Sequence, residues 1–476
     1  MITQVKAVAI KQIFSLLPKI SDKNLIRMLS IAENYLISNE AAKNNARKIR
    51  EAFEQKHPAV TLTKNTLGRL SANCKKKLIE NFFMNAGIFG KEKLKESSEK
   101  LGFGLPWFFV ISPTARCNLK CVGCYAGEYT KDDDLPIEEV DRLLTEAKEL
   151  GIYFITISGG EPFLRKDLLD IFAKHNDMYF LVYTNGTMID EELAKKLAEL
   201  GNVAPGISIE GKEENTDKRR GAGVHKKVLQ AMDNLRKHGV LFGYSATPSK
   251  LTSDVLMSDE FVDLMVEKGS AFGWYFQYVP IGRCPDVNLM STPEQRNKLR
   301  LRIKELRKTK PLFIGDFWND GPHVGGCIAG ARPGGYFHIN CKGDVEPCVF
   351  LHFAVDNIRK KKLAEVMQSD FFKALQKAQP YCANGNLLTP CALIDNPRVL
   401  RALVKKYNAR PTHPGSDTVI KEQKIVKFLD SYSKEFKKIT APVWEKELKG
   451  NYKHWKEKMQ CFGKKEELNE KGEFLP

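Results

Sequence analysis

The chain has 476 residues, of which 42% are hydrophobic, and its formal net charge is +17 at pH 7. This length can bury a large core and suggests about three domains. The longest uncharged run, Ala378–Ile394, is broken by Pro, Asn and Gly, which excludes a membrane span there. Lys6 and Lys11 interrupt the apolar core that a signal peptide needs. We therefore expect a cytoplasmic protein whose eleven cysteines serve as thiols and metal ligands, not as disulfides.

Residues 1–105 are predicted to form a basic, helical N-terminal region, because they carry 19 Lys and Arg against 9 Asp and Glu. Within this region, Val5–Ile20 places its apolar residues roughly on one helical face, with Lys6 and Lys19 away from it. A basic amphipathic helix of this kind can lie on an anionic membrane surface. A helix packed on the protein's own core is the simpler interpretation, and both stay open.

Strand-like and helix-like segments alternate between residues 107 and 308. The apolar, strand-like runs are Trp107–Thr114, Tyr153–Gly160, Tyr179–Gly186, Val203–Gly211, Leu241–Pro248 and Phe272–Pro280. The helix-like segments are Ile137–Leu150, Asp167–His175, Asp190–Leu200, Val224–Gly239, Met257–Lys268 and Pro293–Lys308. This alternation predicts an α/β fold with a parallel sheet and right-handed crossovers. Six such units are too few for a closed eight-stranded barrel.

Three cysteines, Cys117, Cys121 and Cys124, follow the first predicted strand with the spacing C-x3-C-x2-C. Three thiolates on one loop can hold three irons of a [4Fe–4S] cluster and leave the fourth iron open, whereas an electron-transfer cluster uses four cysteines. Zinc is the alternative ligand, but a zinc site needs a further pair of Cys or His that this stretch does not supply. The chain resembles the radical S-adenosylmethionine (radical SAM) enzymes, and Tyr125 strengthens the resemblance.

The resemblance implies a partial (βα)6, TIM-like barrel with its site at the C-terminal ends of the strands. Motifs stand at those ends in order. The two glycines of Gly159–Glu161 permit close backbone approach, and the carboxylate can receive an ammonium group. Ser208 and Glu210 alternate onto one face, suited to ribose hydroxyls.

In the family, the Gly-Gly-Glu segment holds the amino group of the methionine moiety, and an arginine pairs with the cofactor carboxylate. We assign that arginine to Arg220, because it precedes Gly221. The family binds adenine through backbone groups after the sixth strand. The predicted cofactor contacts are Tyr125, Gly159, Gly160, Glu161, Asn185, Ser208, Glu210, Arg220, Thr247, Pro280 and Gly282. The implied chemistry is reductive cleavage of SAM to a 5′-deoxyadenosyl radical, which abstracts hydrogen from an unactivated C–H bond.

A second group of cysteines follows the barrel. Cys327 to Cys348 reads as a β-hairpin that turns at residues 342–344, with one cysteine before it and one after it. This stretch resembles the SPASM/Twitch extension, which binds auxiliary [4Fe–4S] clusters, but the further cysteine run of a full SPASM module is missing. We therefore expect one auxiliary cluster, with zinc as the alternative. Its predicted ligands are Cys327, Cys348, Cys382 and Cys391, whereas Cys341 within the turn is expected to be an uninvolved thiol.

The predicted organisation has four parts. They are the N-terminal region (residues 1–105), the radical SAM barrel (106–310), the auxiliary-cluster domain (311–400) and a basic helical C-terminal region (401–476). No catalytic residue beyond the cluster is assigned.

Three functions stay open. The first is a radical SAM enzyme acting on a lipid or small hydrophobic metabolite at the membrane surface. The absence of a predicted winged-helix peptide-binding domain in residues 1–105 favours it. The second is a maturase that modifies a peptide or protein. The third is a non-catalytic iron–sulfur protein, which the presence of Glu161, Ser208 and Arg220 argues against. The expected partners are a reductant such as flavodoxin or ferredoxin and the substrate, and nucleic acid is not expected.

Overall fold

The computed structural model describes residues 20–31, 33, 40–126, 133–381 and 385–452. Its centre is one curled sheet in the order β11-β9-β8-β1-β2-β3-β4-β5-β6-β7. The first seven strands of the chain are parallel neighbours in sequence order. Their bounds are β1 (Phe108–Ile111), β2 (Phe154–Ile157), β3 (Tyr179–Thr184), β4 (Val203–Ser208), β5 (Gly243–Ala246), β6 (Phe272–Tyr275) and β7 (Phe313–Asp316).

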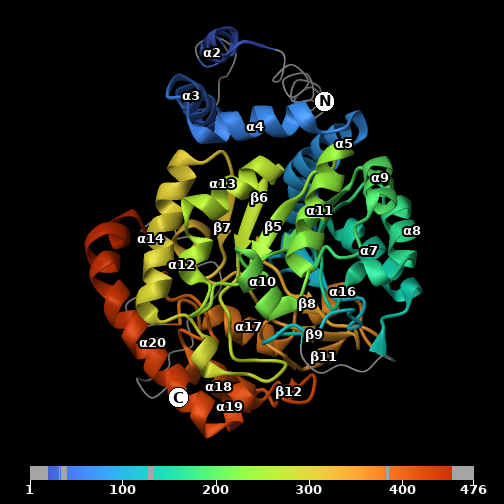
Figure 1. Ribbon diagram of the computed structural model, residues 1–476. Coiled ribbons are helices and arrows are strands. Elements are labelled where there is room, and N and C mark those ends of the chain that lie inside the picture. Colours follow the sequence, from blue (N-terminus) through green and yellow to red (C-terminus); the bar gives the residue numbers. More distant parts are fainter. Residues whose placement is uncertain (1–19, 32, 34–39, 127–132, 382–384, 453–476) are drawn as a thin grey trace.

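Helices cover the outer face of this sheet (Figure 1). The six predicted crossover helices are confirmed to within a few residues as α7 (Ile137–Leu150), α8 (Asp167–Lys174), α9 (Glu191–Leu200), α11 (Val224–Lys237), α13 (Asp259–Lys268) and α14 (Pro293–Thr309). Their starts follow from the sequence. The side chain of Asp190 accepts a hydrogen bond from the backbone of Leu193, and Thr292 forms a capping box with Gln295. The predicted partial barrel is therefore confirmed.

Short helices in the connecting loops complete the barrel. They are η4 (Pro162–Leu164), α10 (Glu213–Arg220), α12 (Ser253–Leu256) and η5 (Val287–Leu289). The seventh parallel strand, β7, was not predicted, and it pairs with β6 from Phe272–Phe313 to Tyr275–Asp316. The run of parallel strands from β1 to β7 is thus one strand wider than the six predicted units.

The predicted hairpin after the barrel is present, and it extends the barrel sheet. Strands β8 (His338–Ile339) and β9 (Asp344–Glu346) pair antiparallel, and β8 also pairs in parallel with β1. The remaining elements of this part are α15 (Gly321–Val324), β10 (Phe353–Ala354), β11 (Asp356–Asn357), α16 (Leu363–Val366) and α17 (Asp370–Lys377). The first barrel strand therefore carries the auxiliary hairpin on its free edge.

The N-terminal region is helical, as predicted. Its elements are α2 (Asp22–Ile31), α3 (Glu40–Glu54), α4 (Pro58–Arg69), α5 (Ala72–Lys77), the π-helical η2 (Leu78–Phe89) and α6 (Gly90–Leu101). In Figure 1, α4 crosses the end of the sheet at which the strands begin, and α2 and α3 project beyond it. The side-chain amide of Asn81 in η2 donates to the backbone oxygens of Asn176 and Met178, which fixes η2 beside β3. The predicted helix Val5–Ile20 lies almost entirely outside the described residues.

The C-terminal region packs against the barrel helix α14. It comprises α18 (Pro397–Lys406), β12 (Arg410–Pro411), α19 (Thr418–Lys421), α20 (Gln423–Val443), η6 (Trp444–Leu448) and η7 (Lys449–Tyr452). Arg296 of α14 is fully buried, pairs with Asp395 at 2.5 Å and lies 3.8 Å from the ring of Phe436 in α20. These contacts tie three segments together that are far apart in the sequence.

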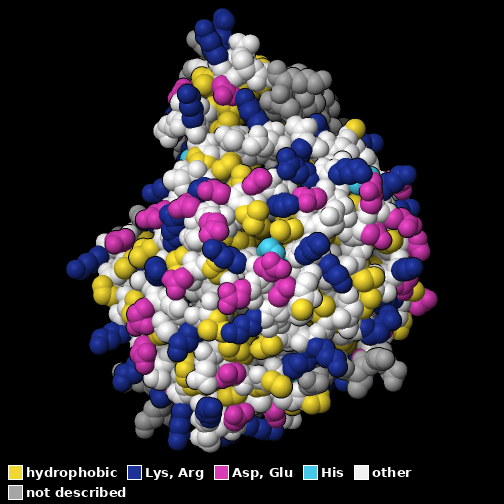
Figure 2. Space-filling model, viewed as in Figure 1, with side chains coloured by type: hydrophobic (Ala, Val, Ile, Leu, Met, Phe, Trp, Pro, Cys, Tyr) yellow, Lys and Arg dark blue, Asp and Glu magenta, His cyan; other side chains and the backbone are white. Residues whose placement is uncertain are grey.

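The surface carries both signs of charge. Figure 2 shows Lys and Arg side chains interspersed with Asp and Glu over the body of the face in view. Within the described part of the chain, no helix is long and apolar enough to cross a membrane.

Candidate functional site

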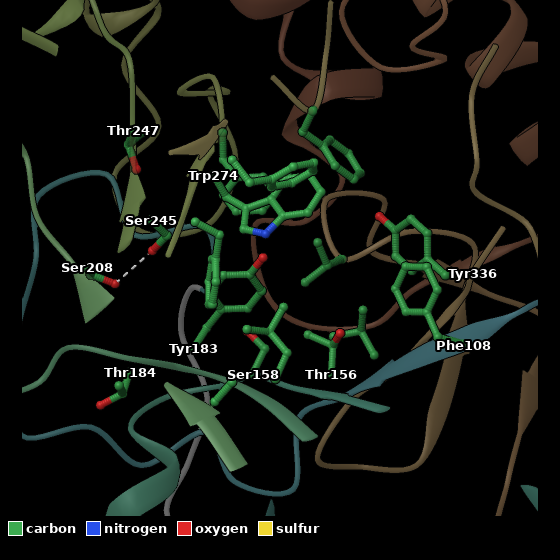
Figure 3. Close-up of a pocket in the computed structure, with 18 of the residues that line it drawn as sticks. Phe108, Thr156, Ser158, Tyr183, Thr184, Ser208, Ser245, Thr247, Trp274 and Tyr336 are labelled. Carbon is green, nitrogen blue, oxygen red and sulfur yellow. Dashed lines mark hydrogen bonds between the residues drawn. The ribbon is translucent and has the colours of Figure 1, made fainter. Parts of the chain in front are cut away.

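A cavity of about 740 Å³ occupies the inside of the barrel. Every second residue of the parallel strands faces it, as the two-residue period of a strand requires. Phe154, Thr156 and Ser158 line it from the β2 segment, and Tyr179, Leu181 and Tyr183 line it from β3. Figure 3 shows side chains of this kind from several strands around one open space.

The three cysteines of the C-x3-C-x2-C loop open into this cavity, as the sequence predicts. Cys117, Cys121 and Cys124 all line it, and none forms a disulfide. Desolvation of its sulfur raises the pKa of Cys117 to about 11, and the nearby Glu161 and the other two thiols act in the same direction. Metal binding removes these protons, because thiolates are the iron ligands. Three thiols on one loop facing one cavity fit a cluster with three protein ligands.

Backbone contacts from two neighbouring segments fix the shape of the cysteine loop. The N–H of Val122 donates to the oxygen of Arg219 at 2.8 Å, and the N–H of Arg283 donates to the oxygen of Cys124 at 2.9 Å. A Cβ at Gly282 would lie 2.3 Å from the oxygen of Cys124, so only glycine permits this approach. Gly282 therefore supports the loop from behind.

The double glycine after β2 lies where the sequence predicts, but the carboxylate beside it does not. Gly159 and Gly160 line the cavity, whereas Glu161 is fully buried behind them. Its carboxylate accepts hydrogen bonds from the Thr184 hydroxyl at 2.7 Å, the Asn185 N–H at 2.7 Å and the Phe163 N–H at 3.1 Å. Burial raises the pKa of Glu161 even so. Its carboxylate is engaged within the protein and is not presented to an ammonium group in the cavity.

Glu210 departs from its predicted orientation in a similar way. Ser208 lines the cavity, but Glu210 is fully buried and forms ion pairs with Arg219 and with Arg220, the latter at 2.6 Å. Burial alone would raise the pKa of Glu210, but the two arginines outweigh it and hold this pKa below its ordinary value. The ion pairs in turn keep both guanidinium groups at the cavity wall. Glu210 thus positions charge and does not itself face the cavity.

Arg220, Asn185 and Thr247 reach the cavity, as predicted. Burial opposes the charge of Arg220, but the attraction of Glu210 and of Cys121 raises its pKa above the ordinary value. The Asn185 side-chain amide lies 3.8 Å from the Cys117 sulfur. The hydroxyl of Thr247 accepts a hydrogen bond from Arg219 at 3.1 Å. The side chains of these three residues place the positive charge of Arg220 and several hydrogen-bonding groups beside the thiols.

Tyr125 lies between the cysteine loop and the auxiliary part. Its ring lines the cavity and lies 5.1 Å from the ring of Phe350, and its hydroxyl lies 2.6 Å from that of Ser158. Burial raises the pKa of this hydroxyl well above its ordinary range, so it stays protonated.

The segment after β6 reaches the cavity through residues that precede the predicted ones. Pro280 and Gly282 do not line the cavity, whereas Gln277, Tyr278 and Val279 do. Gln277 is only 2% exposed, and its buried side-chain nitrogen has no hydrogen-bond partner among the residues that the structure describes. An unpartnered buried amide costs free energy unless a bound group pairs with it. One polar residue within the aromatic run Trp274–Tyr278 is the sequence signal that marks this position.

The auxiliary cysteines lie around a second cavity of about 600 Å³. Cys327, Cys348 and Cys391 line it together. Burial raises the pKa of Cys348 and of Cys391, and the nearby Cys327 raises both further. The pKa of Cys391 is raised to about 12. Cys382 lies outside the described residues, and Cys341 is buried apart from this cavity. Within the described part of the chain, no group of three or more His, Cys, Asp or Glu is arranged to hold a single metal ion.

The two cavities adjoin each other. Both are lined by Leu62, Trp274, Phe313, Phe317, Ile328 and Phe350. The two groups of cysteines therefore lie on either side of one aromatic wall.

Two family models match the chain. The radical SAM superfamily matches residues 111–247, and an iron–sulfur cluster-binding domain, SPASM, matches residues 327–392. The matched regions contain the three loop cysteines and the described auxiliary cysteines, respectively. The second match supports an iron–sulfur site there over the zinc alternative.

Several curated proteins are similar. Fe-coproporphyrin III synthase of Methanosarcina barkeri is 33% identical over 46% of this chain, which spans 57% of that relative. Mycofactocin maturase of Mycolicibacterium smegmatis is 29% identical over 54% of the chain and 68% of the relative. A probable GTP 3′,8-cyclase of Archaeoglobus fulgidus is 30% identical over 57% of the chain and 94% of the relative.

The fold has a counterpart among solved structures. SuiB of Streptococcus suis bound to S-adenosylmethionine superposes with a TM-score of 0.50 at 18% identity, covering 68% of this chain and 78% of SuiB. At this identity the likeness concerns the fold alone. The two family matches and the curated relatives show that the chain belongs to the radical SAM superfamily and is an enzyme that uses S-adenosylmethionine, a [4Fe–4S] cluster and an auxiliary iron–sulfur cluster.

Proposed function

We propose that this enzyme abstracts a hydrogen atom from an unactivated C–H bond of an apolar substrate, or of the apolar part of a larger one, that lies in the barrel cavity. The observation that carries the proposal is the lining of the cavity into which the three thiols open. Apart from Arg219 and Arg220 beside the loop, its described lining residues carry no Lys, Arg, Asp or Glu. A site of this kind binds an apolar group by excluding water from it.

We assign the cluster to Cys117, Cys121 and Cys124. We place SAM against the backbone of Gly159 and Gly160 and against the polar groups at the strand ends, with Arg220 opposite its carboxylate. When bound, the cluster and SAM supply the radical that takes the hydrogen atom. The protein holds the cofactor, excludes water and places one substrate hydrogen within reach. Its aromatic lining, which includes Tyr183 and Trp274, also protects a reactive species from solvent.

Two carboxylates support this site from behind. Glu161 holds the turn that carries Asn185, and Glu210 holds Arg219 and Arg220. Both are positioning residues in this proposal, because neither lines the cavity. Gln277 offers an unpartnered amide to the cofactor or the substrate.

We assign the auxiliary cluster to Cys327, Cys348 and Cys391, with Cys382 as the fourth ligand predicted from the sequence. The Tyr336 hydroxyl lies 2.9 Å from the Cys348 sulfur. A hydrogen bond to a cluster ligand is one means by which a protein sets a cluster potential.

A second candidate for the substrate is a peptide or protein, which the relatives favour. One of them is a maturase, another is an Fe-coproporphyrin III synthase, and neither name refers to a lipid. The relatives therefore support the maturase alternative better than the lipid that the sequence analysis put first. The apolar cavity is compatible with the side chain of a peptide that docks at the strand ends.

The experiment that tests the proposal replaces Cys117, Cys121 and Cys124 with Ala and measures 5′-deoxyadenosine after anaerobic reconstitution and reduction. We expect the product to vanish, while iron falls from about eight to about four atoms per chain, as expected for the loss of one of two cubane clusters. As a control, Cys74→Ala removes a buried thiol outside both cavities and is expected to retain both clusters. Product formation by the triple variant would refute the assignment.

A further inference from the structure

The axis of the barrel is hollow over its whole length. Bulky branched side chains in layers normally fill the interior of such a barrel. Here the inward positions of β4 and β5 are small, and so is one inward position of β7. They are Ala204, Gly206 and Ser208 in β4, Gly243 and Ser245 in β5, and Gly315 in β7.

The glycines leave room for aromatic rings of the neighbouring strands to lie against the channel wall. A Cβ at Gly243 would lie 2.4 Å from the ring of Phe272, and one at Gly315 would lie 2.4 Å from the ring of Trp274. Each ring therefore occupies the space that the neighbouring strand's side chain would take. The rings line the channel and do not plug it, as Figure 3 shows for Trp274.

This channel runs from the first residues of the strands to their last. Along β3, its lining begins at Tyr179 and continues to Thr184. At roughly 3.3 Å per residue this distance is about 16 Å. The side chain of a docked peptide would enter from the cluster end and fill only the upper part of such a channel.

The far end of the channel opens beneath the N-terminal helices. Leu62 and Thr63 of α4 and Phe83 of η2 line it there, next to Phe313 at the start of β7. Phe83 is 37% exposed and Phe313 is 54% exposed, although both line the channel. Among the described residues, these two aromatic side chains face both the channel and solvent, which marks a mouth at this end.

Polarity changes along the channel. The hydroxyls of Ser158, Thr184, Ser208 and Thr247 gather at the cluster end, together with the guanidinium group of Arg220. The far end is lined chiefly by aromatic and aliphatic side chains, and its Thr63 hydroxyl is taken up by the backbone oxygen of Ala59 at 2.8 Å. The exception is the Tyr179 hydroxyl, which is buried there without a hydrogen-bond partner among the described residues. An occupant of the far end must therefore be predominantly hydrocarbon.

We propose that the channel holds one linear hydrocarbon chain of a lipid substrate, which enters through the mouth beneath α4 and extends toward the cluster loop. This inference rests on the proposed function and specifies its substrate class. It places a carbon of the chain, and not a peptide side chain, beside the cofactor. The named relatives point to other substrates, so the test must decide between the two.

The test uses the full-length protein, anaerobically reconstituted and loaded with SAM, and the fluorescent polyene fatty acid cis-parinaric acid as the probe. Straight-chain fatty acids of about 8 to about 18 carbons then compete with the probe. We expect each added methylene to tighten binding by roughly threefold to fourfold until the channel is full, because burial of a methylene contributes about that factor. A pocket for a side chain would reach its plateau with the shortest acids, and this result would overturn the inference.

Two variants locate the bound chain. Thr63→Trp narrows the mouth and Ala204→Phe fills the middle of the channel, and each is expected to weaken probe binding at least tenfold. Thr61→Trp introduces the same side chain on the exposed face of α4 and is expected to bind the probe as the wild type does. Unchanged binding by both channel variants, with native thermal unfolding, would overturn the inference. The proposed function would still stand or fall separately on 5′-deoxyadenosine formation.

Discussion

Two carboxylates illustrate what the sequence can and cannot specify at single residues. The spacing of Cys117, Cys121 and Cys124 predicted a cluster loop without any knowledge of the fold, because the ligand number itself limits the choice of metal site. The orientation of Glu161 and Glu210 could not be predicted in the same way. Both residues lie beyond the end of a strand, where side chains no longer alternate between the two faces of the sheet. Before Glu161, the backbone also turns at Gly159, which has a φ of +116°. The orientation of each carboxylate is set by the buried groups that donate hydrogen bonds to it.

Arg220 offers a test of the cofactor assignment. Replacing it with Ala removes a charged partner of SAM, for which about 1.5–3 kcal/mol is typical. We expect SAM to bind roughly tenfold to a hundredfold more weakly in anaerobic calorimetry, with an unchanged cluster spectrum. Lys218→Ala removes an exposed positive charge from the same helix and serves as the control. Equal affinities of the two variants would contradict the assignment.

Among the elements, the crossover helices and six of the barrel strands could be predicted because their hydrophobic periods are regular. Strand β7 was missed because it follows the run Lys308–Pro311, which resembles a loop. The channel could not be predicted either. The channel depends on which glycine lies beside which aromatic ring of the neighbouring strand. Only the register of the strands supplies that information.

The contacts between α14 and α20 lead to a prediction about the stability of the fold. Arg296 and Asp395 are both fully buried, and the Asp395 carboxylate also accepts a hydrogen bond from the N–H of Cys391 at 3.0 Å. Arg296→Met leaves this carboxylate without its main partner, so we expect a loss of about 3–5 kcal/mol in the free energy of unfolding. Anaerobic denaturant titration measures it, and we expect auxiliary iron to be lost first.

A double variant separates the two causes. Adding Asp395→Asn to Arg296→Met removes the unpaired buried charge and is expected to recover part of the lost stability. If the single variant were as stable as the wild type, the ion pair would not be what joins these segments.

At the scale of the whole molecule, helices α2 to α4 of the basic N-terminal region lie at the same end of the barrel as the mouth beneath α4. Each basic residue near an anionic surface contributes at most about 1 kcal/mol. We predict that the protein binds anionic liposomes at low salt and is released as salt screens the charge. Neutral liposomes are the control in a sedimentation assay.

Deletion of residues 1–20 tests the predicted amphipathic helix. We expect weaker liposome binding with both clusters retained, because the channel and cysteine sites lie elsewhere in the sequence. A protein that ignores anionic vesicles even at low salt would argue against contact with a membrane surface and would favour a peptide or soluble metabolite.

The pairing of β8 with β1 has a consequence for how the molecule can be divided. Strand β1 leads into the cysteine loop and shares backbone hydrogen bonds with the hairpin that leads to Cys348. Cutting the chain after the barrel would leave β1 with an unpaired, apolar edge, which invites other chains to pair with it. The auxiliary part is therefore not an accessory that can be detached. It covers the free edge of β1, and a chain without it would need another cover for that edge.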